Sequence, residues 1–237
     1  MILNHALLNE WHTYFPGSTT SPVTFSFSEK EADIHPEADW KSFLIDGVPI
    51  EISLIRGSHN IENFMASVML AGTVIKNKQK LVKKAQYLAE SFSPSPHRQE
   101  EVAVINGVKY INDSKATNPD AVVAALEEFG NPNQKNIILI AGGLDKNMDF
   151  SPIIEYAGRI RLACLIGEAK NKLRSAWKEK IDCRLCCNLE DALESASKEA
   201  VNGDTVLLSP GCASMDMFAN YQERGEIFRK IVLQTDI

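Results

Sequence analysis

The second half of the sequence predicts a doubly wound α/β domain built on a mostly parallel sheet. From residue 117 onward, helical and strand-like patterns alternate, which is typical of this fold class. The strand-like runs are short and almost wholly apolar, as at residues 137–141, and a parallel sheet that is covered on both faces requires such strands. Upstream, Pro94 and Pro96 cannot continue a helix. We therefore expect two domains, residues 1–92 and residues 93–237.

The elements of the second domain can be assigned in chain order. It begins with a hairpin, because residues 102–105 and 108–111 flank Asn106-Gly107, a strong short-range hairpin signal. Apolar runs then predict the strands, at residues 136–141, 161–166, 182–187 and 205–208. Helical patterns predict the helices between and after them, at residues 120–129, 151–160, 169–180, 189–200 and 218–233.

The first domain is mixed in character. It opens with a short apolar run at residues 2–4, and a strand-like segment follows at residues 48–55. Two helices are expected after that, at residues 61–75 and 78–91, where apolar residues recur at helical spacing.

Composition excludes several classes of protein. The 237 residues have a net charge of −6, which argues against a general nucleic-acid binder, whose surface carries a basic face. No apolar run approaches the ~20 residues of a membrane span. The first residues show neither a basic nor an apolar signal-peptide region, so we expect a cytoplasmic protein.

The five cysteines are an odd number, which indicates reduced thiols in a chain without a secretion signal. Cys183, Cys186 and Cys187 have a zinc-like spacing, but no second Cys/His pair follows at a matching distance. We interpret them as small hydrophobic residues of a buried strand and expect no metal site.

Polar residues gather where strands end, in three loops at residues 112–119, 142–150 and 209–216. Ligands of open α/β sheets bind outside the carboxyl ends of the strands, so we expect these loops to meet at one rim. Lys115, Lys146 and the nearby helix N-termini would attract an anion there.

Each loop also has a purely structural explanation. The first loop could serve simply as a helix cap, and Gly142-Gly143 simply as a tight turn. Ser214 could serve simply as the cap of the last helix. Arg98, which precedes the hairpin, could be an ordinary surface arginine.

The loops contain specific runs of residues: Ile-Asn-Asp-Ser-Lys-Ala-Thr-Asn at 111–118, Gly-Gly-Leu-Asp-Lys at 142–146 and Leu-Ser-Pro-Gly-Cys-Ala-Ser at 208–214. Upstream stand Gly-Ser-His-Asn-Ile-Glu-Asn at 57–63 and Pro-His-Arg at 96–98. In order and spacing these motifs resemble the D-glutamate-adding branch of the Mur ligase family. The resemblance implies an ATP-dependent amide ligase of peptidoglycan precursor synthesis, which joins D-glutamate to UDP-N-acetylmuramoyl-L-alanine through an acyl phosphate.

The same resemblance assigns roles to individual residues. Those implied to bind the nucleotide are Asn60, Asn63, Arg98, Asp113 and Lys115. Those implied to bind D-glutamate are Thr117, Lys146, Ser214, Met215 and Tyr221. ATP is expected to act with Mg²⁺, and the partners are these small-molecule substrates.

Two departures from the family pattern limit this expectation. No G-x-x-x-x-G-K-[ST] loop, which holds nucleotide phosphates, occurs in the chain, and residues 5–8 read His-Ala-Leu-Leu where the family tends to have an acidic pair. Residues 1–92 are therefore expected to be the C-terminal part of the central ATP-binding domain. They should hold no catalytic residue or Mg²⁺ ligand, and the chain alone should be inactive. The alternatives are another Mur or folylpolyglutamate-type ligase, or a truncated binding module without catalysis.

Overall fold

The computed structural model describes residues 2–4, 23–25, 41–45, 47–55, 58–92 and 95–234. The chain divides into two compact units, Met1–Ser93 and Pro94–Ile237. Residues 5–8, where the sequence departs from the expected acidic pair, lie outside the described residues.

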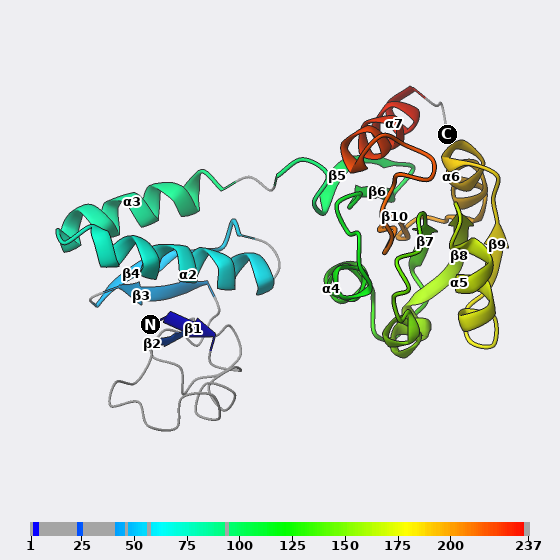
Figure 1. The fold of residues 1–237 in the computed structure, drawn as a ribbon. Coiled ribbons are helices and arrows are strands. Elements are labelled where there is room, and N and C mark those ends of the chain that lie inside the picture. The colour runs from blue at the N-terminus through cyan, green and yellow to red at the C-terminus, as the bar shows by residue number, and fades with distance from the viewer. Residues whose placement is uncertain are drawn as a thin grey trace. The chain divides into compact units, whose positions relative to one another are not determined.

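The described residues of the first unit form two small sheets and two long helices. Strands β1 (Ile2–Asn4) and β2 (Val23–Phe25) pair in parallel, and β3 (Ser42–Ile45) and β4 (Val48–Glu51) form an antiparallel pair. Helices α2 (Ser58–Val74) and α3 (Lys78–Glu90) follow and pack with β3 and β4 around one apolar core (Figure 1). The strand predicted at residues 48–55 is wrong in length, because pairing with β3 ends at Glu51 although the chain stays buried at Ile52 and Ile55.

The second unit is the doubly wound α/β domain that the sequence predicts. Its strands are β5 (Glu100–Ile105), β6 (Val108–Asn112), β7 (Ile137–Gly142), β8 (Ile160–Ile166), β9 (Cys183–Leu185) and β10 (Thr205–Leu208). They form one sheet in the order β5-β6-β10-β7-β8-β9. Only β5 runs antiparallel to its neighbour; the pairs among the other five strands are all parallel.

Helices cover both faces of this sheet (Figure 1). One face packs against α4 (Pro119–Phe129), the 3-10 helix η2 (Ser151–Arg159) and α5 (Lys170–Trp177). The other packs against α6 (Leu189–Glu199) and α7 (Tyr221–Gln234). The sheet thus separates two apolar cores, and its all-buried middle strand β7 contacts both.

Local chemistry explains where several of these elements begin. The predicted β5–β6 hairpin is confirmed: Asn106 and Gly107 have φ values of 51° and 77°, as a two-residue turn with both centres left-handed requires. Asn118 caps α4, because its side chain accepts a hydrogen bond from the amide of Ala121 at 2.9 Å and Pro119 follows at the first helical position.

Three expectations for this unit need correction. The segment at 151–160 is a 3-10 helix, and the last helix begins at Tyr221 and not at residue 218. The run at 182–187 is not a buried strand. Only Cys183–Leu185 pairs, at the sheet edge, and Cys187 is exposed while Cys186 is buried. An edge strand has one neighbour and needs no continuous apolar run.

The described residues contain neither a candidate membrane span nor a candidate metal centre. None of the helices there is long and apolar enough to cross a bilayer. Within the same ranges, no three His, Cys, Asp or Glu side chains lie close enough together to hold a metal ion.

Candidate functional site at the carboxyl edge of the sheet

The three polar loops meet at one edge of the second unit, as the sequence predicts. Backbone hydrogen bonds join the loop after β10 to the other two: the amide of Gly211 donates to Ala116 at 2.9 Å, and the amide of Gly142 donates to Pro210 at 2.8 Å. A further bond of 2.8 Å joins the amide of Leu144 to the carbonyl of Ala213. The loops are therefore parts of one cross-linked surface and not three independent turns.

The glycine pair after β7 is required by this close packing. Gly142 and Gly143 have φ values of 112° and 139°, which side chains rarely allow. A Cβ on Gly142 would lie 2.1 Å from the carbonyl oxygen of Ile166, and one on Gly143 would lie 2.3 Å from that of Ala213. The pair does make a tight turn, but that turn is also what brings the β7 loop against the β10 loop.

Asp113 is a buried carboxylate at the end of β6. It accepts hydrogen bonds from the Ser209 hydroxyl at 2.9 Å and from the Gln99 amide at 3.2 Å. Burial raises its pKa from 3.8 to about 7, although both hydrogen bonds and the nearby charge of Arg98 act in the opposite direction. A hydroxyl-rich ligand or a cation that reached this carboxylate would stabilise its charged form.

A second buried charge, Arg224 of α7, lies beneath the loops. Its guanidinium donates to the Ser114 hydroxyl at 3.0 Å and to the Ser114 carbonyl at 2.8 Å. Two further bonds of 3.2 Å end on the carbonyl of Cys212. Burial lowers the pKa of Arg224 to about 10, so it remains charged at neutral pH. This cation therefore bonds α7 to two of the three loops.

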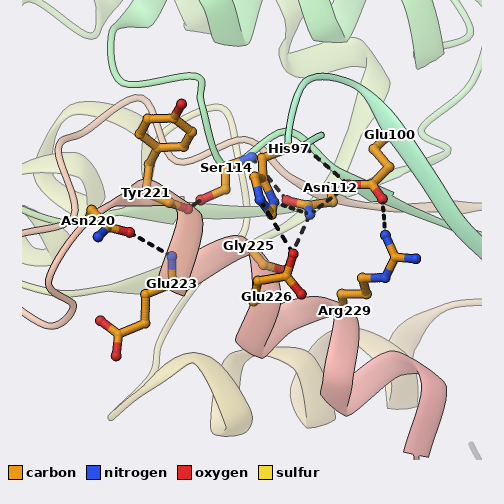
Figure 2. Close-up of polar contacts among 10 residues, drawn as sticks. All are labelled: His97, Glu100, Asn112, Ser114, Asn220, Tyr221, Glu223, Gly225, Glu226 and Arg229. Carbon is orange, nitrogen blue, oxygen red and sulfur yellow. Dashed lines mark hydrogen bonds and ion pairs between the residues drawn. The ribbon is translucent and has the colours of Figure 1, made fainter. Parts of the chain in front are cut away.

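The first turn of α7 is held at the same place. Figure 2 shows the Ser114 hydroxyl donating to the backbone oxygen of Tyr221, at 2.8 Å. It also shows Asn220 accepting from the amide of Glu223 at the start of the helix, at 2.8 Å. The structural explanation for Ser214 is thus wrong, because the side chain that bonds a free amide in the first turn of α7 is that of Asn220 and not that of Ser214. Ser214 instead accepts from the amides of Met217 and Phe218 through its backbone oxygen.

The remaining residues with implied D-glutamate roles lie on these loops. Ser214 is buried, Met215 is exposed, and Tyr221 is half-buried with the amine of Lys115 5.8 Å from its ring centroid. Thr117 is half-buried ahead of α4. Lys146 is exposed and follows Asp145, whose carboxylate forms an ion pair of 2.8 Å with Lys172.

Asn60 and Asn63 belong to the first unit, on α2. They line a cavity of about 500 Å³ between α2 and α3 whose walls are mostly apolar, with Phe64, Val68 and Leu81 among them. A planar, weakly polar group would fit such a cavity, with amide side chains at its rim for hydrogen bonds.

Three residues in this region received no role from the sequence: His97, Asn112 and Arg224. His97 and Asn112 lie within the motifs at residues 96–98 and 111–118, but spacing alone does not show that any of the three side chains is buried. The sequence did contain a signal that Arg224 is buried. Phe228 and Val232 follow it at intervals of four residues, which places all three on the buried face of α7.

The chain is similar in sequence to known proteins. Residues 97–212 match the family model for the Mur ligase, glutamate ligase domain. The UDP-N-acetylmuramoylalanine--D-glutamate ligase of Clostridium botulinum (strain Okra / Type B1) is 38% identical over 186 residues, which are 75% of this chain and 39% of that protein. The protein of the same name from Thermoanaerobacter sp. (strain X514) is 39% identical over 198 residues, which are 79% of this chain and 40% of that protein. The chain thus spans about two fifths of the curated relatives it matches.

Solved structures support the fold. A folylpolyglutamate synthase of Mycobacterium tuberculosis, complexed with ADP and AMPPCP, superposes with a TM-score of 0.67 at 12% identity, over 96% of this chain and 54% of that one. MurF from Acinetobacter baumannii superposes with a TM-score of 0.65 at 13% identity, over 99% of this chain and 51% of that one. These structures show a shared fold, and the domain match together with the curated relatives shows that the chain belongs to the Mur ligase family.

Proposed function

We propose that this chain is the nucleotide- and D-glutamate-binding part of the ATP-dependent ligase that joins D-glutamate to UDP-N-acetylmuramoyl-L-alanine. The observation that carries the proposal is the identity of 38–39% to ligases of this name over three quarters of the chain. The cross-linked loops at the carboxyl edge provide a place where two ligands can be held side by side.

The nucleotide would be bound by the groups around Asp113. A buried carboxylate that bonds neutral donors is suited to accept hydrogen bonds from ribose hydroxyls, and Arg98 beside it is suited to contact phosphate oxygens. Lys115 lies on the same loop. In the first unit, taken by itself, Asn60 and Asn63 would offer hydrogen bonds to an adenine ring in the cavity that they line.

D-glutamate would be bound by the loops on the other side of Ser114. Its two carboxylates require cations and N–H donors, which Lys146 and the loop at Ser214 and Met215 can supply, with Thr117 and Tyr221 at the borders. In the proposed reaction ATP first converts the carboxylate of UDP-N-acetylmuramoyl-L-alanine into an acyl phosphate. The amine of D-glutamate then attacks this acyl phosphate and displaces inorganic phosphate. This part of the enzyme then contributes by orientation, which can lower a two-substrate barrier substantially.

Mg²⁺ accompanies ATP in this proposal and would be held largely by the ATP phosphates and water, with one or two carboxylates of the protein. Mg²⁺ prefers near-octahedral oxygen ligands, and the described ranges hold no cluster of three side chains able to ligate a metal. We therefore place its protein ligands outside the described residues and assign no step to it here.

Binding experiments on two reciprocal variants test the proposal. Lys146→Met keeps the aliphatic stem and removes the charge; a hydrogen bond to a charged group contributes ~1.5–3 kcal/mol, or roughly ten- to a hundredfold in affinity. We expect that loss for D-glutamate and little change for ADP, measured by NMR titration of the chain. Asp113→Ala should show the reverse.

L-glutamate and a melting curve of each variant serve as controls. Equal weakening of both ligands by Lys146→Met would contradict the assignment of this loop. Preference for L-glutamate would favour a folylpolyglutamate-type ligase instead. A wild-type chain that binds neither ligand would refute the proposed function of these loops.

A further inference from the structure

The side chain of Asn112 is a fully buried junction between three segments of the second unit (Figure 2). Its amide nitrogen lies 3.0 Å from Nδ1 of His97, 3.2 Å from a carboxylate oxygen of Glu100 and 3.3 Å from the carbonyl oxygen of Gly225. Its oxygen accepts from the amide of Ser114 at 3.2 Å. One amide thus joins the chain before β5, the end of β6 and helix α7.

The segment on the first side of this junction is held in an unfavourable conformation. His97 is buried and has a φ of 63°, which non-glycine residues rarely adopt and which persists only where surroundings enforce it. Its amide donates to Glu100 at 3.0 Å, and its carbonyl accepts from Lys115 at 3.0 Å. Because Nδ1 faces the donating amide of Asn112, it acts as the acceptor and the ring proton belongs on Nε2, which lies 3.5 Å from Glu226.

The helix on the other side approaches so closely that only glycine fits. A Cβ on Gly225 would lie 2.3 Å from Nδ1 of His97 and 3.1 Å from the amide nitrogen of Asn112. Arg229, one turn later on α7, forms an ion pair with Glu100. This ion pair holds in place the carboxylate that accepts from the side-chain amide of Asn112. The three segments are therefore mutually braced, with Asn112 as their common partner.

The position of this junction connects the two proposed ligand sites. Arg98 is the residue after His97, and Asp113 is the residue after Asn112. Ser114, which Asn112 also bonds, donates to the backbone of Tyr221. We propose that Asn112 is a positioning residue, whose amide holds Arg98, Asp113 and the first turn of α7 in the relative placement that the nucleotide needs. The idea rests on the proposed function, because it takes Arg98 and Asp113 as nucleotide-binding residues.

Two variants and a matched control separate this role from general stabilisation. Asn112→Asp keeps the shape and replaces the donor by a carboxylate that faces Glu100. Gly225→Ala inserts a methyl group against His97 while it improves helix propensity, and it alters no residue assigned to a ligand. The control is Asn136→Asp, at the opposite end of the sheet. Asn136 is also buried, with its amide bonding Phe129 at 3.1 Å and its oxygen accepting from Asn131 at 2.7 Å.

Hydrogen exchange and ADP binding at pH 8 provide two independent readouts. We expect faster exchange at residues 97–99 and in the first turns of α7 for both test variants, and ADP affinity lower by about tenfold, as for the loss of one charged-group hydrogen bond. The control should leave both readouts close to wild type even if its melting temperature falls.

Unchanged amide hydrogen exchange in both test variants would overturn the inference that Asn112 braces these three segments. Faster exchange with unchanged ADP affinity, or an equal loss of affinity in the control, would overturn the positioning role. If wild type binds no ADP, the nucleotide assignment of the proposed function is what fails, and the positioning role falls with it. Exchange then still decides whether the junction exists.

Discussion

Replacing the buried carboxyl of Asp113 by a neutral amide should stabilise the second unit at alkaline pH. Asp113→Asn keeps the size of the side chain, an oxygen that can accept from Gln99 and a polar group against the Ser209 hydroxyl. It removes the charge that burial opposes. The variant therefore isolates the energetic cost of ionising this position in the folded protein.

The expected pH dependence follows from the pKa of Asp113, raised from 3.8 to about 7 in the folded state. Below the pKa of Asp113 in the unfolded state, this group is protonated in both states and the free energy of unfolding has its full value. As pH rises towards 7, only the unfolded state releases the proton, so the free energy of unfolding falls; above 7 the loss is constant. Three pKa units correspond to about 4 kcal/mol, an upper limit for the advantage of Asp113→Asn at pH 8 over its value at pH 4.

Urea unfolding at several pH values between 5 and 8 measures this difference. The indole proton of Trp177 reports on the second unit alone, since this side chain is buried and donates to the Phe150 carbonyl at 3.1 Å. Asp149→Asn is the control: hydrogen bonds from Ser151 lower the pKa of this exposed carboxylate, so its contribution changes only below the tested range. A difference between wild type and Asp113→Asn that is constant from pH 5 to 8 would refute the reasoning.

Three further outcomes are expected. Gly142→Ala should destabilise the second unit by on the order of 3 kcal/mol in urea unfolding, because the new Cβ would meet the Ile166 carbonyl at 2.1 Å; an unchanged midpoint would contradict this. Arg224→Met should cost about 3 kcal/mol by leaving the buried Ser114 and Cys212 acceptors unpaired, and Arg224→Lys should recover part of that loss; equal midpoints for the two variants would count against it. With ATP, UDP-N-acetylmuramoyl-L-alanine and D-glutamate the chain should release no phosphate, because it contains no G-x-x-x-x-G-K-[ST] loop; release that Asp113→Ala abolishes would disprove this.

The fold of the second unit could be predicted from the sequence to the level of its elements. Apolar runs and helical spacing report which face of a segment is buried, and this local information was enough for β7, α4 and the β5–β6 hairpin. It does not report which strand is the neighbour. The edge position of β9 and the insertion of β10 between β6 and β7 therefore had no counterpart in the sequence pattern.

The candidate site, too, could be predicted from the sequence only in part. That three loops meet follows from a general property of parallel sheets, and the sequence suffices for it. How they are fastened does not follow, because the fastening residues bond across large separations. Asn112 and the Gly225 carbonyl are 113 residues apart, and Arg224 and Ser114 are 110 apart. The roles of Lys146, Thr117 and the other implied ligand residues stay predictions.

The central place of β10 has a consequence for how the protein is made. Its neighbours β6 and β7 leave the ribosome first, and Asp113 and Ser209, which later bond each other, are separated by 96 residues. At ~5–20 residues per second, translation leaves β6 without this partner for roughly 5–20 seconds, and β7 for a somewhat shorter time because it ends later in the chain. During that interval their facing edges are unpaired and open to other nascent chains. Synthesis that stops before residue 205 therefore yields a polypeptide whose sheet lacks β10, and quality-control proteases should recognise it.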